Sequence, residues 1–408
     1  MYDLIVIGAG PSGIFASIFF KKNNKSAKVL ILEKTDIVLH KVKISGGGRC
    51  NVTNIENDPK ILVKNYPRGY KELLSCFYKF NTKDTINFFE NKNIKLKSQV
   101  DGRVFPQSNN SMSIVNALLD EIDKLNIEIK KNQSVVNIKK ENDLFEINTN
   151  NEKFLAKNLL IATGSSKMGY EFAKIFDHTI IEPIPSLFTF NCKNFLLKDL
   201  SGVAIKDAMV KIVDSKFYQL GDLLITHFGF SGPCILKLSA FAARYIFEKK
   251  YIFKISINWL GELNFENILN KLIEFKKKNP NQKLLQNNIF NLPKNLSKHF
   301  LKSLKIIDKK LIEISKKDLI NLSNKLTNDI YQINTKSLNK QEFVTCGGIK
   351  LNEVDFKTMQ SKKTKNLYFA GEVLDIDGIT GGFNFQNAFT TGYIAGTSMK
   401  TNDNNQNT

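Results

Sequence analysis

Three glycines and one acid near the start of the chain have the types and spacing needed to bind a nucleotide. Gly8, Gly10 and Gly13 form a G-x-G-x-x-G pattern, and Glu33 follows twenty residues after Gly13. In this pattern the first glycine permits a tight turn, the second lets the backbone approach a pyrophosphate, and the third lets a helix pack closely on a strand. A carboxylate at the position of Glu33 can accept both hydrogen bonds of a ribose diol. The spacing predicts a dinucleotide site, and the alternative is a chance glycine turn.

The elements that must position these residues can be read from the same stretch. Residues 2–7 form an apolar run of strand length, a helix is expected from residue 14 onward, and residues 28–32 form a second apolar run. The N-terminus of that helix, close to Pro11 and Ser12, would offer free N–H groups and a partial positive charge to the phosphates. We therefore expect one strand–turn–helix–strand unit.

A second glycine-rich stretch, residues 43–54, directly follows the second of these strands. Its three consecutive glycines allow the backbone to lie against a flat or charged ligand, and Ser45, Arg49 and Asn51 add hydrogen-bond donors. Only four of the 59 basic residues are arginines, so an arginine here hints at a site that needs a planar, bidentate donor. The alternative is a flexible surface loop.

Motifs spread in order along nearly the whole chain resemble those of one flavoprotein family. The matching segments are residues 45–54, 102–106, 162–164, 226–233, 344–348, 367–375 and 381–386. On these motifs the chain is identified as a member of the BaiN/YhiN-type FAD-dependent oxidoreductases, formerly grouped as an aminoacetone-oxidase family. The resemblance implies an α/β fold with an FAD-binding Rossmann-like (glutathione-reductase-type) domain, split by an insertion made of a β-rich domain and a small helical domain. It also implies that the dinucleotide is FAD.

The resemblance assigns the residues that bind FAD. Glu372 would bind the ribitol hydroxyls, the backbone near Val135 would touch the adenine, and the N-terminus of a helix over 384–399 would face the flavin pyrimidine edge. That positive helix end would stabilise negative charge on the reduced ring. The expected set is Gly8, Gly10, Pro11, Ser12, Gly13, Glu33, Lys34, Lys41, Ser45, Gly47, Gly48, Arg49, Cys50, Asn51, Arg103, Val135, Ala162, Thr163, Gly164, Gly371, Glu372, Asp377, Gly382, Asn384, Phe385 and Gln386.

Changes of pattern along the chain predict the domain boundaries. The expected parts are a first FAD-binding part over 1–185, a β-rich insertion over 186–262, a basic helical domain over 263–326, a return strand of the β-rich domain over 327–340, and a second FAD-binding part over 341–408. Within them, residues 153–156 and 159–164 read as separate strands, and 235–247 as one helix.

The chemistry of the cysteines and histidines points away from a metal. The five cysteines are scattered without a C-x-x-C pair and the four histidines are dispersed, so neither a disulfide framework nor a metal site is indicated. No apolar run approaches the ~20 residues of a membrane span and no signal segment precedes the first strand. We therefore expect a cytoplasmic protein that does not associate with a membrane.

Two residues are candidates for proton transfer or redox chemistry. Cys50 lies between Arg49 and Asn51, and Arg49 would favour its thiolate; the alternative is a buried structural thiol. His227 can donate a proton at neutral pH; the alternative is a packing role. Because only one dinucleotide fingerprint is present, NAD(P)H is expected to dock transiently over the flavin as electron donor, which predicts ping-pong kinetics.

The net charge of +20 bears on the substrate. Between residues 263 and 325 there are fourteen lysines against five acids, which favours a phosphate-rich partner, although an AT-rich coding bias would also enrich lysine. The family resemblance implies reduction of an activated C=C bond, and the basic segment favours a uridine of large-subunit ribosomal RNA or its precursor, reduced to dihydrouridine after unstacking. The alternatives are a small-molecule ene reductase, an amine oxidase, and a non-catalytic flavin-binding partner protein. Nothing in the sequence specifies an oligomeric state.

Overall fold

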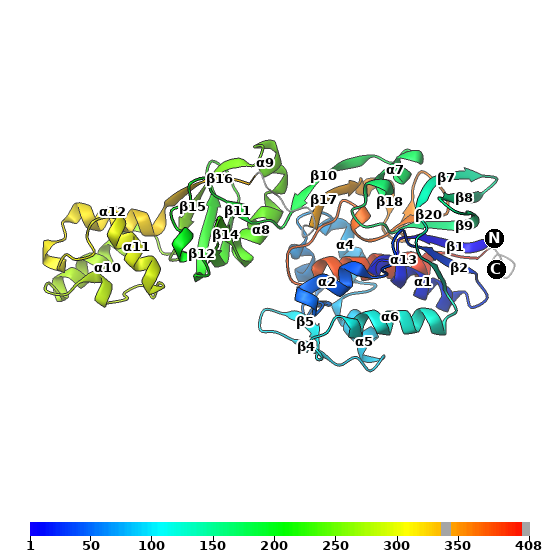
Figure 1. The fold of residues 1–408 in the computed structure, drawn as a ribbon, viewed down its shortest axis with the longest axis horizontal. Helices are drawn as coiled ribbons and strands as arrows, with labels where there is room; N and C mark the ends of the chain where they lie inside the picture. The colour runs from blue at the N-terminus through cyan, green and yellow to red at the C-terminus, as the bar shows by residue number, and fades with distance from the viewer. Residues whose placement is uncertain (336–343, 402–408) are drawn as a thin grey trace. The chain divides into compact units, whose positions relative to one another are not determined.

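The computed structural model describes residues 1–335 and 344–401, and these divide into two compact units (Figure 1). One unit combines Met1–Ile184 with Thr345–Thr408, and the other is Pro185–Val344. The first unit is thus assembled from both ends of the chain, which Figure 1 shows together in blue to green and in orange to red. The expected boundary between residues 340 and 341 lies outside the described residues.

A nine-stranded sheet forms the centre of the first unit. Its strands run in the order β18-β19-β20-β9-β1-β2-β6, with β8 on β9 and β7 on β8. The pairs from β20 through β9, β1 and β2 to β6 are parallel. The middle strands are apolar runs rather than alternating ones because helices and other elements cover both of their faces. The bounds are β1 Tyr2–Ile7, β2 Val29–Leu32, β6 Glu128–Lys130, β7 Val135–Glu141, β8 Leu144–Thr149, β9 Lys153–Ile161, β18 Val354–Asp355, β19 Gln360–Ser361 and β20 Leu367–Phe369.

The prediction of separate strands over 153–156 and 159–164 is wrong, because β9 is one continuous strand. Its first half pairs antiparallel with β8, from Lys153 to Ala156, and its second half pairs parallel with β1, from Ala156 to Ile161. The sequence suggested two strands because the burial pattern changes midway, from alternating to continuous. One strand therefore joins the meander to the parallel sheet.

Two helices, α1 (Pro11–Asn23) and α13 (Phe383–Ser398), pack closely beside this sheet. A Cβ atom added to Gly392 of α13 would lie 2.5 Å from the carbonyl oxygen of Ser12, and one added to Gly396 would lie 2.3 Å from that of Ala16. The residue numbers at these two contacts increase in the same direction along both helices, so the helices run parallel. α13 begins about eight residues before α1 along this shared direction, or about 12 Å at the helical rise per residue.

Shorter elements complete the first unit. The small antiparallel sheet β3-β5-β4 and the pair β10-β17 stand apart from the main sheet. Their bounds are β3 Thr53–Asn54, β4 Leu96–Ser98, β5 Arg103–Pro106, β10 Ile180–Ser186 and β17 Val344–Ile349. The helices and single turns are α2 His40–Gly48, α3 Pro59–Leu62, η1 Val63–Asn65, α4 Tyr70–Phe77, α5 Thr82–Glu90, α6 Met112–Lys124, α7 Lys167–Ile175, η5 Leu351–Glu353 and η6 Gly371–Val373.

The second unit is an antiparallel sheet followed by a helical part. The sheet has the order β11-β14-β13-β12-β15-β16, and one apolar core runs from it into the helices, with Trp259 and Phe300 in ring contact at 5.5 Å. The strands are β11 Phe190–Asn191, β12 Ala204–Ile212, β13 Tyr218–Ile225, β14 Gly229–Ser231, β15 Ile252–Asn258 and β16 Asp329–Asn334. The helices and turns are η2 Lys198–Leu200, α8 Pro233–Phe241, α9 Ala243–Glu248, α10 Phe265–Lys278, η3 Leu284–Gln286, α11 Lys294–Ser303, η4 Leu311–Glu313 and α12 Lys316–Thr327.

The single helix predicted over 235–247 is corrected to two, α8 and α9, which meet at Ala242. The predicted α/β class, with a split Rossmann-like domain and an insertion of β-rich and helical parts, is confirmed. Among the described residues, no helix is both long enough and apolar enough to cross a membrane.

Candidate cofactor site

The first glycine motif forms the turn between β1 and α1. Gly8 has φ +107°, and an added Cβ would lie 2.6 Å from the carbonyl oxygen of Ala162; one added to Gly13 would lie 2.2 Å from that of Gly8. A Cβ added to Gly10 would meet no atom within 4 Å. Pro11 occupies the start of α1, and no side chain caps the helix. Gly8 and Gly13 therefore serve packing, whereas Gly10 leaves open space beside a free helix N-terminus, as a bound pyrophosphate requires.

Glu33 stands at the end of β2 and is held by backbone donors. One carboxylate oxygen accepts from Ala9 N at 3.0 Å, and the other accepts from Thr35 N at 3.0 Å and Thr35 Oγ1 at 2.9 Å. A carboxylate offers about four acceptor positions, so three donors leave capacity for a ribose hydroxyl. Lys34 beside it is exposed, and Val135 is buried at the start of β7.

The second glycine stretch leaves helical geometry at the end of α2. Gly46, Gly47 and Gly48 all have positive φ, and Cβ atoms added to Gly47 or Gly48 would meet nothing within 4 Å. Ser111, which the sequence analysis missed, holds this turn: its Oγ donates to Lys43 O at 2.7 Å and its N–H donates to Gly48 O at 2.8 Å. Gly47 and Gly48 therefore border open space, while the hydrogen bonds from Ser111 hold the turn in place.

Arg49 and Cys50 follow this turn and behave differently from the prediction. The Arg49 guanidinium lies 4.5 Å from the centre of the Phe105 ring and donates to Gly46 O at 3.2 Å. Cys50 is 1% exposed, and burial raises the pKa of its thiol to about 12, against a small lowering from Ser45. The prediction that Arg49 favours a Cys50 thiolate is therefore wrong. Arg103, also predicted, pairs with Asp101 at 2.7 Å beside the same ring.

The start of α13 is fastened to the second glycine stretch. With the Asn51 amide oriented to satisfy both ends, its oxygen accepts from Gly382 N at 2.9 Å. Gly382 has φ +93°, and an added Cβ would lie 2.3 Å from Thr53 O. No side chain caps α13, and Tyr66 OH, a residue without a local sequence signal, donates to Phe383 O at 2.6 Å. The N-terminus of α13 is thus rigidly placed and open.

The side chains of the predicted residues on α13 serve mainly to hold it. Asn384 bonds both the N–H and the carbonyl of Gly378, each at 2.9 Å. Gln386 is fully buried and bonds Thr53, Thr85 and Thr390. Phe385 is half-buried and stacks on Phe389. The backbone N–H groups of Asn384 and Phe385, rather than their side chains, are what α13 offers a ligand, because the N–H of Gln386 already donates to Gly382 O at 3.0 Å.

Glu372 and Lys41 form an ion pair in the first unit. Lys41 donates to one oxygen of Glu372, and Thr345 N donates to the other at 3.2 Å. Both side chains come within 3.8 Å of the Cβ position of Gly164. Gly371 brings this group to α1, because its Cβ position is 2.6 Å from Ser12 Oγ.

Three further side chains of the first unit, Asp377, Thr163 and Asn387, have buried polar atoms. Asp377 is fully buried in a bidentate pair with Arg68, the planar donor role that the rarity of arginine suggested. Thr163 Oγ1 and Asn387 Oδ1 are buried and have no hydrogen-bond partner among the described residues. The Thr163 hydroxyl lies against Gly169 of α7, where an added Cβ would be 1.8 Å from its oxygen.

The second candidate for catalysis, His227, lies in the second unit. His227 is exposed at the tip of the β13–β14 hairpin in the second unit, next to Phe228, which is 72% exposed. It belongs to the second unit, whereas the residues described above belong to the first. Among the described residues, no group of three or more His, Cys, Asp or Glu side chains is placed to hold a metal ion.

The arrangement suits an elongated ligand with an anionic group at one end and a flat, electron-accepting ring at the other. Two uncapped helix N-termini point the same way, offset by about 12 Å along their shared direction, and each carries a partial positive charge. A Cβ added at Gly10, Gly47 or Gly48 would meet no atom within 4 Å, and Glu372 and Lys41 pair beside Gly164. These features fit FAD, with its pyrophosphate at α1 and its flavin at α13.

Comparison with known proteins agrees with this geometry. Residues 2–398 match the family model described as the HI0933-like protein Rossmann domain. The chain is 30% identical over 403 residues to the ribosomal RNA dihydrouridine synthase of Escherichia coli (strain K12), with 96% of each chain covered. It is 27% identical over 418 residues to the 3-dehydro-bile acid delta(4,6)-reductase of Clostridium scindens, covering 96% of this chain and 97% of that one.

The fold is also found among solved structures. A 3-ketosteroid-delta4-(5alpha)-dehydrogenase from Rhodococcus jostii RHA1 superposes with a TM-score of 0.53 at 12% identity, covering 98% of this chain and 97% of the other. At that identity the likeness concerns the fold alone.

Proposed function

The chain belongs to the HI0933-like Rossmann-domain family, and from this premise we propose that it is an FAD-dependent oxidoreductase that reduces a uridine of large-subunit ribosomal RNA to dihydrouridine. The observation that carries the choice of substrate is the similarity to a ribosomal RNA dihydrouridine synthase, because it covers 96% of both chains and so includes the insertion. NAD(P)H is the proposed electron donor, and the cytoplasm, where ribosomes are assembled, the proposed location.

The reaction adds a hydride and a proton across the C5–C6 double bond of uracil. FAD, once reduced, supplies the hydride. The chain supplies the binding: α1 and Gly10 hold the pyrophosphate, Glu33 the ribose, Glu372 the ribitol, and the N-terminus of α13 stabilises negative charge on the ring.

His227 is the better of the two candidates for proton donor. Its imidazole is exposed, whereas the Cys50 thiol is buried and, with a pKa raised to about 12 by that burial, gives up its proton poorly. A His227→Asn enzyme that retains flavin but loses turnover of RNA supports this role. Full turnover by that variant would remove His227 from the mechanism.

The insertion supplies a surface for phosphates. Of the fourteen lysines between residues 263 and 325, two, Lys309 and Lys325, have a carboxylate partner within 4 Å in the described part of the chain. Uncompensated lysines attract a phosphate backbone and release its counterions. This favours RNA over an uncharged substrate.

The test is anaerobic. The purified flavoprotein is reduced with NADPH or NADH, then mixed with ribosomal RNA lacking dihydrouridine. We expect flavin reoxidation matched by one dihydrouridine per RNA, measured by mass spectrometry of the digested RNA. RNA that already carries the modification is the control. Reduced flavin that RNA leaves unchanged would overturn the proposal.

A second candidate is reduction of a conjugated C=C bond in a small molecule, favoured by the similarity to the bile acid reductase. A steroid enone that reoxidises the flavin faster than RNA does would shift the assignment to it. The amine-oxidase and non-catalytic alternatives are not favoured.

A further inference from the structure

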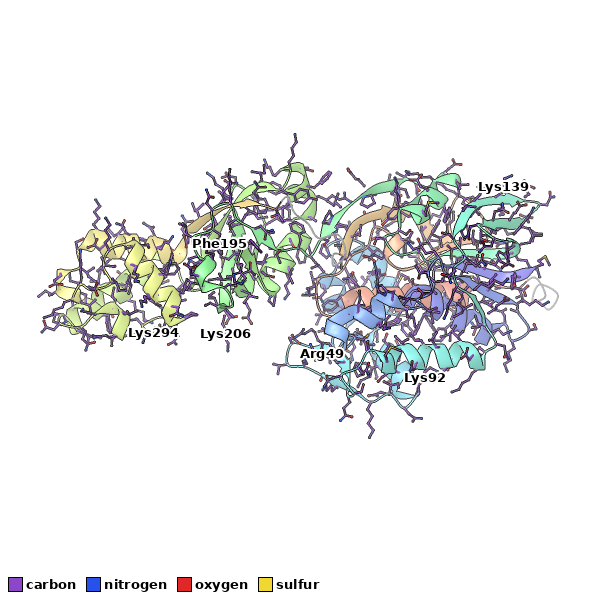
Figure 2. The ribbon with its side chains drawn as sticks, viewed as in Figure 1. Arg49, Lys92, Lys139, Phe195, Lys206 and Lys294 are labelled. Carbon is purple, nitrogen blue, oxygen red and sulfur yellow. The ribbon has the colours of Figure 1, made fainter. Side chains whose placement is uncertain are left out.

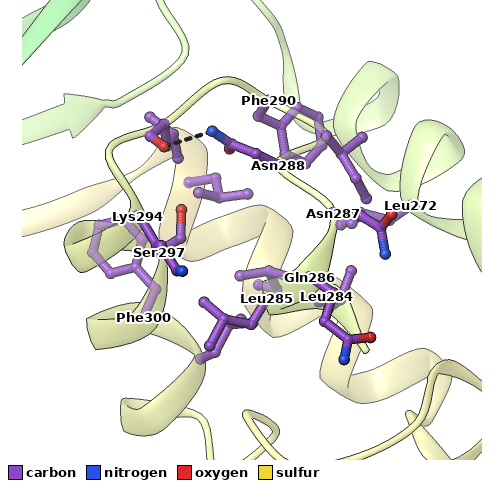
Figure 3. Close-up of a pocket in the computed structure, with 15 residues that line it drawn as sticks. Leu272, Leu284, Leu285, Gln286, Asn287, Asn288, Phe290, Lys294, Ser297 and Phe300 are labelled. Atoms are coloured by element: carbon purple, nitrogen blue, oxygen red, sulfur yellow. Dashed lines mark hydrogen bonds between the residues drawn. The ribbon is translucent and has the colours of Figure 1, made fainter. Parts of the chain in front are cut away.

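A cavity in the helical part of the second unit lies outside the cofactor site. It has a volume of about 380 Å³, within the range of roughly 300–1,000 Å³ that small-molecule sites span. Its walls are formed by α10, α11, α12 and the segment 284–292 between α10 and α11, with Leu272, Leu301 and Leu322 contributing apolar side chains (Figure 3).

Polar groups line this apolar cavity on more than one side. The amide nitrogen of Asn288 donates to Leu292 O at 2.9 Å, and that of Asn287 donates to Lys283 O at 3.2 Å. These bonds fix the two amides, and their oxygens have no partner among the described residues. Lys294 and Ser297, one turn apart on α11, also line the cavity, and Figure 3 shows them opposite Asn287.

Phe290 separates the cavity from a larger cleft. The cleft has a volume of about 860 Å³ and lies between the segment 288–294 and the loops at β12 and Gly261. Phe290 lines both spaces, is partly buried, and has Lys271 Nζ 5.2 Å from its ring centre. Lys206, Lys271 and Lys294 line the cleft, together with the acids Asp207 and Glu262. Lys206 and Lys294 are labelled in Figure 2.

An aromatic ring, unused amide oxygens and nearby lysines are what a single unstacked nucleotide requires. Its base stacks on an aromatic face, its edge bonds to amides and hydroxyls, and its phosphates bind cations. The positive charge of the helices around the cavity complements RNA.

We propose that this cavity holds one unstacked base of the RNA, beside Phe290, while Lys271 and Lys294 in the cleft hold the flanking phosphates. The base is a second one, apart from the uridine that is reduced, and serves to anchor the substrate. This inference rests on the proposed function, since it takes RNA as the substrate.

Binding of two labelled probes to the full-length flavoprotein tests it. One probe is a short single-stranded oligouridylate, and the other is an abasic oligomer with the same number of phosphates. Replacing Phe290→Ala should weaken the oligouridylate about 10-fold, the scale of one base–aromatic stack, and change the abasic probe less than twofold. Lys294→Gln should weaken binding of both probes. It should also lower the slope of log affinity against log salt concentration by about 0.7, the share of one phosphate on a single strand.

Phe217→Ala and Lys216→Gln are the matched controls. Phe217 is also partly buried with a lysine, Lys216, 5.8 Å from its ring centre, and lines neither space. Phe290→Trp keeps an aromatic face and should restore binding, which covers the case of a misfolded alanine variant. Equal losses for both probes, or no loss, overturn the inference.

Turnover separates this inference from the proposed function. A base-selective loss in an enzyme that reduces no uridine would leave the anchoring pocket standing and reject the reaction. Normal uridine reduction without any base-selective loss of binding would support the reaction and reject the anchoring pocket.

Discussion

Gly10 and Gly13 lie three residues apart in one turn, yet they restrict substitution for different reasons. A Cβ at Gly10 meets nothing in the protein, whereas one at Gly13 would lie 2.2 Å from the carbonyl oxygen of Gly8. Gly10→Ala should therefore leave the melting temperature of the flavin-free protein within a degree or two but weaken FAD binding at least 10-fold. Gly13→Ala should lower the stability of the flavin-free protein itself, by about 1–3 kcal/mol.

Thermal unfolding and flavin titration of both flavin-free variants check this contrast. Gly10→Ala protein that binds FAD normally would mean that the open space at this residue does not receive the cofactor.

The buried thiol of Cys50 makes a prediction about pH. Burial raises its pKa to about 12, against 9.0 for an unperturbed thiol. The unfolded state therefore loses this proton first as pH rises above about 9, and the folded state loses stability from there toward 12. In the native protein Cys50 should resist iodoacetamide up to about pH 10 and react promptly after unfolding. Peptide mass spectrometry locates the label, and fast native labelling at neutral pH would contradict the expected burial.

Residues with a local signature could be foreseen, and those without one could not. Gly13 and Glu33 can be recognised by their spacing, since the backbone groups that they contact, at Gly8 and Ala9, lie in the same strand–turn–helix unit. Ser111 and Tyr66 act on parts of the chain 63 and 317 residues away, and a serine or tyrosine in a sequence does not name so distant a partner.

At the scale of elements, α13 depends on two glycines that face α1. A Cβ at Gly396 would lie 2.3 Å from the Ala16 carbonyl, a backbone atom that cannot move cheaply. Gly396→Ala should cost about 1–3 kcal/mol of stability and weaken FAD binding, because the helix N-termini would separate. Thr397→Ala on the same helix is the control. Denaturant unfolding and flavin titration measure both effects, and unchanged affinity in a destabilised Gly396→Ala protein would show that the two helix starts act independently.

Secondary structure was foreseen where periodicity was strong. The helix predicted over 384–399 appears within one residue at each end as α13. The break between α8 and α9 at Ala242 has no glycine or proline to mark it. The second half of β9 is held by β1 and β20, which come from the two ends of the chain, and no local pattern contains them.

At the scale of the whole molecule, each unit has its own interior. The apolar core of the second unit is drawn entirely from residues 188–333, whereas every residue assigned to FAD lies in the first. FAD at about 100 times its dissociation constant should stabilise the first unit by about 2.7 kcal/mol and leave the second unchanged. Hydrogen exchange followed by peptide should show this, with slower exchange in core peptides of the first unit. Equal slowing of hydrogen exchange in peptides that cover 253–257 and 319–326 of the second unit would mean that the units unfold together.

The position of α13 at the end of the chain has a consequence during synthesis. The half of the nucleotide site made by residues 8–164 leaves the ribosome first, and the contiguous second unit follows before η6 and α13 exist. At about 5–20 residues per second, roughly 10–50 s separate Gly164 from the end of α13. Over that interval β9 lacks β20 and α1 lacks its partner helix, so a nascent chain exposes an unpaired strand edge and an apolar helix face. The second unit can finish folding while the first unit is still incomplete. The nascent chain therefore exposes most apolar surface to chaperones during this interval.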